Sequence, residues 1–390
     1  MTDVMVVAGA RTGIGDYGGG LKEVPPTRLG SIAIREAVKR ANADPASIGH
    51  VVMGSVIHGE ARDMYLSRVA AVDAGLPVGT PCLTVNRLCG SGLQAVVSAA
   101  QHILLGDCAI AVAGGAESMS RAAYMLPSGR WGQRMGDAPV IDAMTAALHD
   151  PFGHGHMGVT AENIAAKYGF TREQQDQFAL ESHKRAARAI ESGYFQSQVV
   201  PVELKTRKGV EQFTTDEHVR ADASMENLAK LKPVFKKDGT VTAANASGIN
   251  DGAAAIVLMD AKAAKNAKPM ARLVAYAHAG VDPQVMGLGP IPAVKRVFEK
   301  SGLKPADMDV IESNEAFAVQ AMAVTQDLGL DPAKVNPNGG AVALGHPVGA
   351  TGAILTVKAL YELQRTQKRY ALVTMCIGGG QGIAAIFERA

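Results

Sequence analysis

An internal repeat, at an offset of 260 residues, is the feature that most constrains the fold of this chain. Residues 31–54 align with residues 291–314, and each copy reads as a helix, a Pro-containing turn and a strand. The identical pairs in this register are Ala33/Ala293, Pro45/Pro305, Ala46/Ala306, Gly92/Gly352, Val97/Val357 and Ala99/Ala359. Several matches at one offset indicate two copies of one domain, so functional groups are expected where the copies meet.

Apolar strand-like runs alternate with helix-like segments in both copies, which predicts an α/β fold. Residues 118–249 differ from the two copies in their sequence pattern and are predicted to be an insertion, which carries the sole tryptophan, Trp131. Thr171 and Gln174 form a capping-box pattern that predicts a helix running towards Gly193. The expected division is therefore 1–117 with 250–268, an inserted domain at 118–249, and 269–390.

Composition excludes several classes of protein. Lys and Arg total 39 against 37 for Asp and Glu, so no overall basic field favours nucleic acid. No apolar run reaches the roughly 18 uninterrupted residues of a membrane helix, and the start does not resemble a targeting peptide, so a cytoplasmic protein is expected. The four cysteines have no Cys-x-x-Cys spacing, which argues against structural zinc and disulfides.

Cys89 is the first candidate for chemistry. It lies in residues 86–92 (NRLCGSG), after an apolar run and before a helical pattern. Backbone N–H groups at a helix N-terminus stabilise a thiolate, which predicts a nucleophile with a lowered pKa. The alternative is a buried cysteine in a tight turn.

His346 lies in residues 345–352 (GHPVGATG), at the corresponding junction of the second copy. A neutral imidazole there can accept the thiol proton, as acyl transfer through a thioester requires, although a lone histidine can also be structural. Cys376 opens residues 376–382 (CIGGGQG) at a strand end, and the glycine run offers N–H donors for an oxyanion. A dinucleotide loop is excluded there because no helix with an acidic partner follows. Asn314 closes a strand in residues 314–318 (NEAFA), where it can orient water or a carbonyl.

At these four segments the sequence resembles the thiolase family, and the resemblance covers the whole chain. Further similarity at residues 62–65 (RDMY), 86–88 (NRL) and 149–152 (HDPF) is closest to the bacterial broad-range β-ketothiolases that supply polyhydroxyalkanoate synthesis. The resemblance implies the thiolase fold: two pseudo-symmetric halves in five αβαβα layers, an inserted loop domain that binds coenzyme A (CoA), and a homotetramer built as a dimer of dimers.

The resemblance also implies roles. Cys89 would take the acyl group, His346 would activate it, and Cys376 would move a proton to and from the α-carbon or the leaving CoA. Asn314, through a water, and His346 would form one oxyanion hole, with the amides of Cys89 and Gly378 forming the other. Claisen chemistry develops negative charge at two places, on an enolate and on a tetrahedral oxygen, so two such sites are expected.

The family's substrate-binding positions match a further set of residues. The CoA arm would be held by Leu148, His156, Met157, Arg220, Phe235, Ala243 and Ser247, with Ala316 and Phe317 beside the pantetheine and Met286 lining the acyl pocket. Met157, Phe235 and Met286 can also be read as core residues. A metal pair of His154 with His156 is discounted, because an i, i+2 pair without an acid or Cys is a poor zinc site.

The expected function is that of an acetyl-CoA C-acyltransferase, a β-ketothiolase that reversibly condenses acetyl-CoA with a short acyl-CoA. The substrates and partners are acetyl-CoA, acyl-CoA and CoA, and neither a metal nor a cofactor is expected. A non-catalytic acyl-CoA carrier on the same fold would be expected to lack Cys89, His346 or Cys376. A decarboxylating ketoacyl synthase would pair its cysteine with two histidines, or with His and Asn, where this chain has Cys376.

Overall fold

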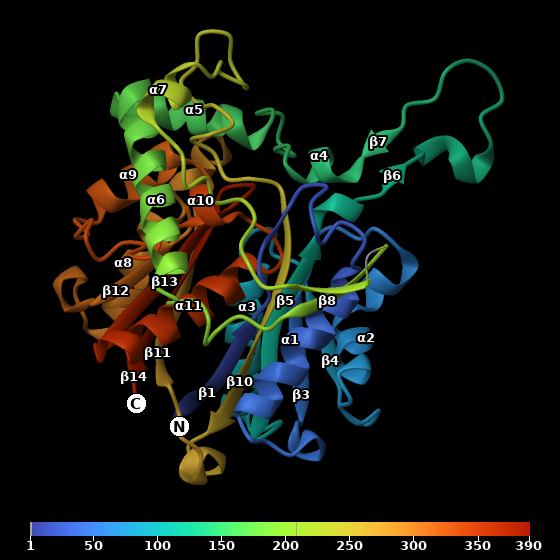
Figure 1. The fold of residues 1–390 in the computed structure, drawn as a ribbon, viewed down its shortest axis with the longest axis vertical. Coiled ribbons are helices and arrows are strands. Elements are labelled where there is room, and N and C mark those ends of the chain that lie inside the picture. The colour runs from blue at the N-terminus through green and yellow to red at the C-terminus, as the bar shows by residue number, and fades with distance from the viewer. Residues whose placement is uncertain (1, 208) are drawn as a thin grey trace.

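The computed structural model describes residues 2–207 and 209–390, which form a mixed sheet flanked and divided by helices (Figure 1). The strand order is β12-β13-β14-β11-β1-β10-β5-β3-β4. These strands span β1 Val4–Arg11, β3 His50–Gly54, β4 Cys82–Val85, β5 Ile110–Ser118, β10 Asn250–Asp260, β11 Ala271–Gly280, β12 Val310–Ser313, β13 Tyr370–Ile377 and β14 Gln381–Arg389. The short β2, Gly15–Asp16, pairs with β10.

The order of the strands reads as two similar halves joined at β1 and β11. That junction consists of the pairs Met5↔Arg272 and Val6↔Ala271, whereas β1 pairs with β10 along its length. In each half a parallel pair leads into antiparallel strands: β3 is parallel to β5, and β12 is parallel to β13. The repeat inferred from the sequence is therefore present in the topology.

Helices form three layers around the two half-sheets (Figure 1). The outer layer of the first half holds α1 (Pro26–Arg40) and α2 (Leu66–Asp73), and that of the second half holds α8 (Pro290–Ser301) and α9 (Ala318–Asp327). The central layer holds α3 (Ser91–Leu105) and α11 (Thr351–Thr366), which contact each other. The expected five-layer α/β arrangement is confirmed.

The side chains of a strand alternate between the two faces of its half-sheet, and here both faces pack against helices. On β10, Ala254, Ile256 and Leu258 join the central core, and the alternate residues Ala255 and Val257 join the core beneath α1. Successive side chains of a strand point to opposite faces, so a strand between two helical layers is apolar throughout.

The segment between β5 and β10 covers one end of both halves and continues along the side of the molecule that faces the viewer in Figure 1. Its elements are β6 Tyr124–Met125, β7 Ile141–Asp142, α4 Ala143–Ala147, α5 Met157–Tyr168, α6 Arg172–Glu191, β8 Val202–Thr206, β9 Gly209–Phe213 and α7 Met225–Ala229. The predicted capping box opens α6, since Thr171 and Gln174 each accept the other's backbone N–H. The segment is folded as expected, while its treatment as a separate domain stays a prediction.

A buried ion pair fastens this segment to β1. Arg11 donates to both carboxylate oxygens of Asp216, at 2.7 and 3.0 Å, and to Gln198 Oε1 at 2.9 Å. A bidentate pair with further hydrogen bonds satisfies charges that burial would otherwise make costly.

One stretch of the described residues, Leu88–Leu105, is long and apolar enough by composition to cross a membrane, and 56% of it is buried inside the protein. It contains α3, whose residues Val96, Val97 and Ala100 are inaccessible to solvent. Burial of this kind is typical of a core helix.

Candidate active site

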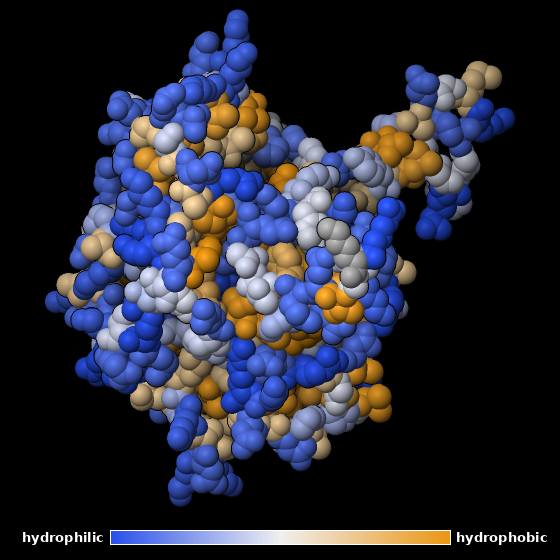
Figure 2. All heavy atoms as spheres, viewed as in Figure 1, coloured by the Kyte–Doolittle hydropathy of each residue, from blue (hydrophilic) through white to orange (hydrophobic). Residues whose placement is uncertain are grey.

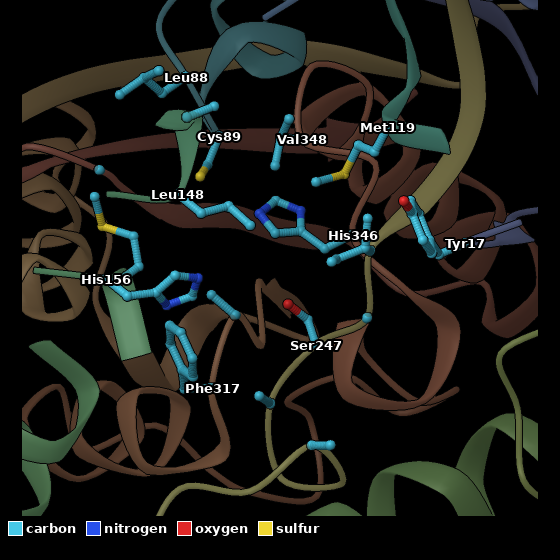
Figure 3. A pocket seen from close by; sticks show the side chains of 18 of the residues that line it. Tyr17, Leu88, Cys89, Met119, Leu148, His156, Ser247, Phe317, His346 and Val348 are labelled. Carbon is cyan, nitrogen blue, oxygen red and sulfur yellow. The ribbon is translucent and has the colours of Figure 1, made fainter. Parts of the chain in front are cut away.

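A cavity of about 440 Å³ lies where the two halves and the inserted segment meet. Predicted residues that line it are Cys89, Leu148, His156, Met157, Phe235, Ala243, Ser247, Met286, Ala316, Phe317, His346 and Gly378. Figure 3 shows the Cys89 thiol and the His346 ring pointing into this space, with Leu148, His156 and Phe317 on its walls. The structure thus brings together residues from widely separated parts of the chain.

Cys89 sits in the tight turn between β4 and α3. The Asn86 side chain accepts the Leu88 N–H at 2.9 Å, and Ser91 Oγ accepts the Arg87 N–H at 2.8 Å and donates to the Leu88 carbonyl at 2.6 Å. Leu88 has φ +45°, in the left-handed region that non-glycine residues rarely occupy. Side-chain hydrogen bonds hold this strained turn, which presents the thiol to the cavity.

The pKa of the Cys89 thiol is raised, not lowered as the sequence suggested. Burial is the largest cause, and it outweighs the N–H groups of Gly378 and Cys89, which lie against the sulfur and act in the opposite direction. The prediction counted the donors at the helix start but not the depth of the site. Cys89 therefore rests as a neutral thiol that needs a base.

His346 lies between α10 (Ala341–Leu344) and α11, and its tautomer follows from its partners. Nδ1 is 2.6 Å from Thr351 Oγ1, whose hydroxyl donates to the Pro347 carbonyl at 2.9 Å. Because that hydroxyl proton is committed, Nδ1 carries the proton and donates it to Thr351, which leaves Nε2 as an acceptor. The backbone N–H of His346 is fixed by Asn250 Oδ1 at 2.8 Å.

Burial lowers the pKa of His346 to about 4, so the imidazole is neutral around pH 7. The Asn314 side-chain nitrogen lies 3.4 Å from His346 Nε2. Among the described residues, Asn314 Oδ1 is buried without a hydrogen-bond partner. An unsatisfied acceptor beside the imidazole is suited to holding a water or a substrate group.

Cys376 and Asn314 are fully buried behind the cavity surface instead of lining it. Burial, with a smaller contribution from the nearby Cys89, raises the pKa of the Cys376 thiol well above its ordinary value. After Gly378 the chain turns directly into β14, as expected from the absence of a helical pattern there.

Aromatic side chains from the inserted segment form the wall opposite the thiol. The His156 ring stacks on Phe235 at 4.6 Å between centroids, and Phe235 meets Phe317 edge-on at 6.2 Å. A side chain at Gly158 would overlap the Phe235 ring, so glycine is required beneath it. This wall joins the insertion to the second half and gives the cavity its apolar character.

Arg220 is the one predicted substrate residue that does not line the cavity. Its guanidinium is 3.0 Å from Asp16 Oδ2, and Asp16 also accepts from His218 Nδ1 at 2.7 Å. Asp16 and His218 do line the cavity, so Arg220 stands just behind its polar edge.

Sequence reasoning missed several lining residues: Asp16, Tyr17, Val56, Met119, Ala147, His218, Val234, Ala246, Gly248, Ile249 and Val348. Val348 lies in the motif of residues 345–352, and Gly248 and Ile249 adjoin Ser247. Their closeness in sequence to predicted site residues could have identified these three. Asp16 and Met119 had no such signal, because tertiary folding alone brings them to the cavity.

Comparisons with known proteins agree with this geometry. Residues 4–262 match the thiolase N-terminal domain, and residues 267–389 match the thiolase C-terminal domain. The chain belongs to the thiolase family. It is an enzyme, an acyltransferase of the β-ketothiolase type, as the four motifs predicted.

Relatives and solved structures align over nearly the full chain. The beta-ketothiolase BktB of Cupriavidus necator is 63% identical, covering 99% of both chains, and an acetyl-CoA acetyltransferase of the same species is 49% identical, covering 100% of both. The crystal structure of human mitochondrial 3-ketoacyl-CoA thiolase has a TM-score of 0.98 at 44% identity and covers 100% of this chain and 99% of that one. The predictions of family and fold are confirmed.

The protonation state of His346 leads to a prediction for this thiolase. Its pKa lies below the ordinary value of about 6.5, so the neutral base persists as pH falls through 6.5 and is lost only on approaching about pH 4. We expect kcat/KM for acetoacetyl-CoA thiolysis to show no acid limb near pH 6.5, when measured from about pH 8 to about pH 5.5. A decline centred near pH 6.5 would show that His346 is solvated in the working enzyme.

Proposed function

We propose that this thiolase condenses acetyl-CoA with a short acyl-CoA, and cleaves the 3-ketoacyl-CoA product in reverse, through an acyl group on Cys89. The observation that carries the proposal is that Cys89, His346 and Gly378 meet at one cavity, with the Cys376 thiol buried behind its surface next to Cys89. Acyl transfer followed by carbon–carbon bond formation needs a nucleophile, a base and stabilisation of two oxyanions. Two thiols, an imidazole and two sets of hydrogen-bond donors would meet these needs.

In the first half-reaction, His346 Nε2 takes the Cys89 proton as the sulfur attacks the thioester carbonyl of an acyl-CoA. The N–H groups of Gly378 and Cys89 receive the developing oxyanion, since they already lie against the sulfur. The tetrahedral intermediate collapses and the CoA thiolate leaves with the proton of Cys376. The products are acyl-Cys89, protonated His346, a Cys376 thiolate and free CoA.

In the second half-reaction, the Cys376 thiolate removes an α-proton from acetyl-CoA. The resulting enolate carbon attacks the acyl carbonyl, and the tetrahedral intermediate expels Cys89, which recovers its proton from His346. Because burial raises the pKa of Cys376 far above the ordinary thiol value, its thiolate is a strong base. A strong base is required for the weakly acidic α-carbon, and Asn314 with His346 would stabilise the enolate oxygen.

We assign substrate binding to the cavity walls. The CoA arm would run past Leu148, Met157 and Ser247. Phe317 would lie beside the pantetheine and Met286 would line the acyl pocket, and all of these residues line the cavity. A solved human 3-ketoacyl-CoA thiolase in complex with CoA, 43% identical at a TM-score of 0.97, supports CoA as the substrate carrier. One methylene changes discrimination by only about 1–3 kcal/mol, so short homologues are expected to compete.

Thiolysis of acetoacetyl-, 3-ketovaleryl- and 3-ketohexanoyl-CoA tests the two-thiol mechanism. We expect Cys89→Ala and Cys376→Ala each to lower kcat by about a thousandfold or more, because each removes a group that reacts in every turnover. Cys82→Ala and Cys108→Ala are matched controls, since both thiols lie outside the cavity, and they are expected to keep wild-type rates. A wild-type rate in either Cys89→Ala or Cys376→Ala would contradict the two-thiol mechanism.

We also propose the homotetramer, on the evidence of a projecting arm. Residues 124–142 extend away from the body of the protein (Figures 1 and 2), and Trp131 and Met135 on it are 87% and 92% exposed. Apolar side chains on an extended arm are typical of contacts with another chain, here a second copy. We expect light scattering to give a tetramer for the wild type and a smaller assembly for Trp131→Ser/Met135→Ser. A double variant that remains tetrameric would contradict this role of the arm.

A further inference from the structure

A fully buried carboxylate, Glu117, lies beside the catalytic centre and has no part in the mechanism above. It is the penultimate residue of β5 and has no exposed surface. Within the described residues no Lys, Arg or His forms an ion pair with it. A buried carboxylate without a cation is costly unless backbone donors satisfy it, so its presence here calls for a physical explanation.

Three backbone N–H groups converge on this carboxylate. Glu117 Oε2 accepts from Val56 at 3.0 Å and from Gly349 at 2.9 Å, and Oε1 accepts from Ile57 at 3.1 Å. Val56 and Ile57 follow β3 in the first half, whereas Gly349 belongs to the turn that carries His346 in the second half. One oxygen atom therefore ties the two halves together.

The approach of the 347–350 turn to Glu117 depends on a set of glycines. A side chain at Gly349 would place Cβ 2.5 Å from Glu117 Oε2, and one at Gly54 would come within 2.6 Å of the Gly349 carbonyl. A side chain at Gly115 would overlap that same carbonyl. The turn is thus inserted against the ends of β3 and β5, with the Glu117 carboxylate as its polar contact.

We propose that Glu117 is a positioning residue that holds the His346 turn against Cys89. Val56 and Val348 line the cavity on either side of this link, and Figure 3 shows Val348 close to both Cys89 and His346. Releasing the Gly349 N–H frees the segment between His346 and α11, and small displacements of a base from its nucleophile reduce rate more than they reduce binding.

The link does not depend on the charge of Glu117. Burial, with a smaller contribution from Asp63, raises the pKa of Glu117 to about 8 against the effect of the three donors. With the proton on Oε1, Oε2 is a carbonyl-type oxygen that still accepts from both Val56 and Gly349. An amide in place of the carboxyl group keeps that acceptor, whereas a thioether of similar size does not.

Glu117→Gln and Glu117→Met therefore form a matched pair. For thiolysis of acetoacetyl-CoA, we expect Glu117→Met to lower kcat at least about tenfold with KM for CoA within about twofold of wild type, and Glu117→Gln to keep kcat within about threefold. The rate is counted per active site by stoichiometric alkylation of Cys89, so partial unfolding does not lower it. Asp309→Leu is the control, because Asp309 also accepts two backbone N–H groups but at the far end of β12 and β13.

Equal kcat values for the two Glu117 variants, or a loss confined to KM, would overturn the positioning role. If Glu117→Met does not fold, Gly349→Ala displaces the same contact from the other side and is expected to give the same selective loss of kcat. This inference rests on the proposed roles of Cys89 and His346. Those roles are tested separately: if Cys89→Ala keeps its activity they are wrong, whatever the Glu117 variants show.

Discussion

The close crossing of the two central helices is the constraint on which the rest of the structure depends. At Gly92 a Cβ would lie 2.6 Å from the Ala353 nitrogen, and at Gly352 one would overlap the Leu93 backbone. These glycines are equivalent in the internal repeat, so each helix provides the space that the other needs. Because Cys89 and His346 lie in the turns that lead into the two helices, the crossing brings the thiol and the imidazole to the same cavity.

Burial at this crossing determines the chemistry of the site. It raises the pKa of both Cys89 and Cys376 and lowers that of His346, so all three groups rest in their neutral forms. In the proposed mechanism charge appears only during the reaction, when the N–H groups near Cys89 and the side chain of Asn314 would already be in position. A preorganised and buried site makes such donors far more effective than they would be in water.

Much of the fold and most of the site were predictable from the sequence, because local signals coincided with the repeat. The match of Gly92 with Gly352 implied two halves, and the junctions before them located Cys89 and His346. The direction of the Cys89 pKa shift was not predictable, since it depends on how deeply the second half and the insertion bury the thiol. Asp16 and Glu117 were missed for a related reason: each acts through partners distant in sequence.

The central claim is that Cys89 carries the acyl group, and trapping that intermediate tests it most directly. The wild type is mixed with acetyl-CoA, quenched in acid, digested and examined by peptide mass spectrometry. We predict one acetyl group on the peptide that contains Cys89 and none on those containing Cys82, Cys108 or Cys376, with labelling lost in His346→Ala. An enzyme that forms acetoacetyl-CoA while Cys89 stays unmodified, or with the acetyl group on Cys376, would contradict the claim.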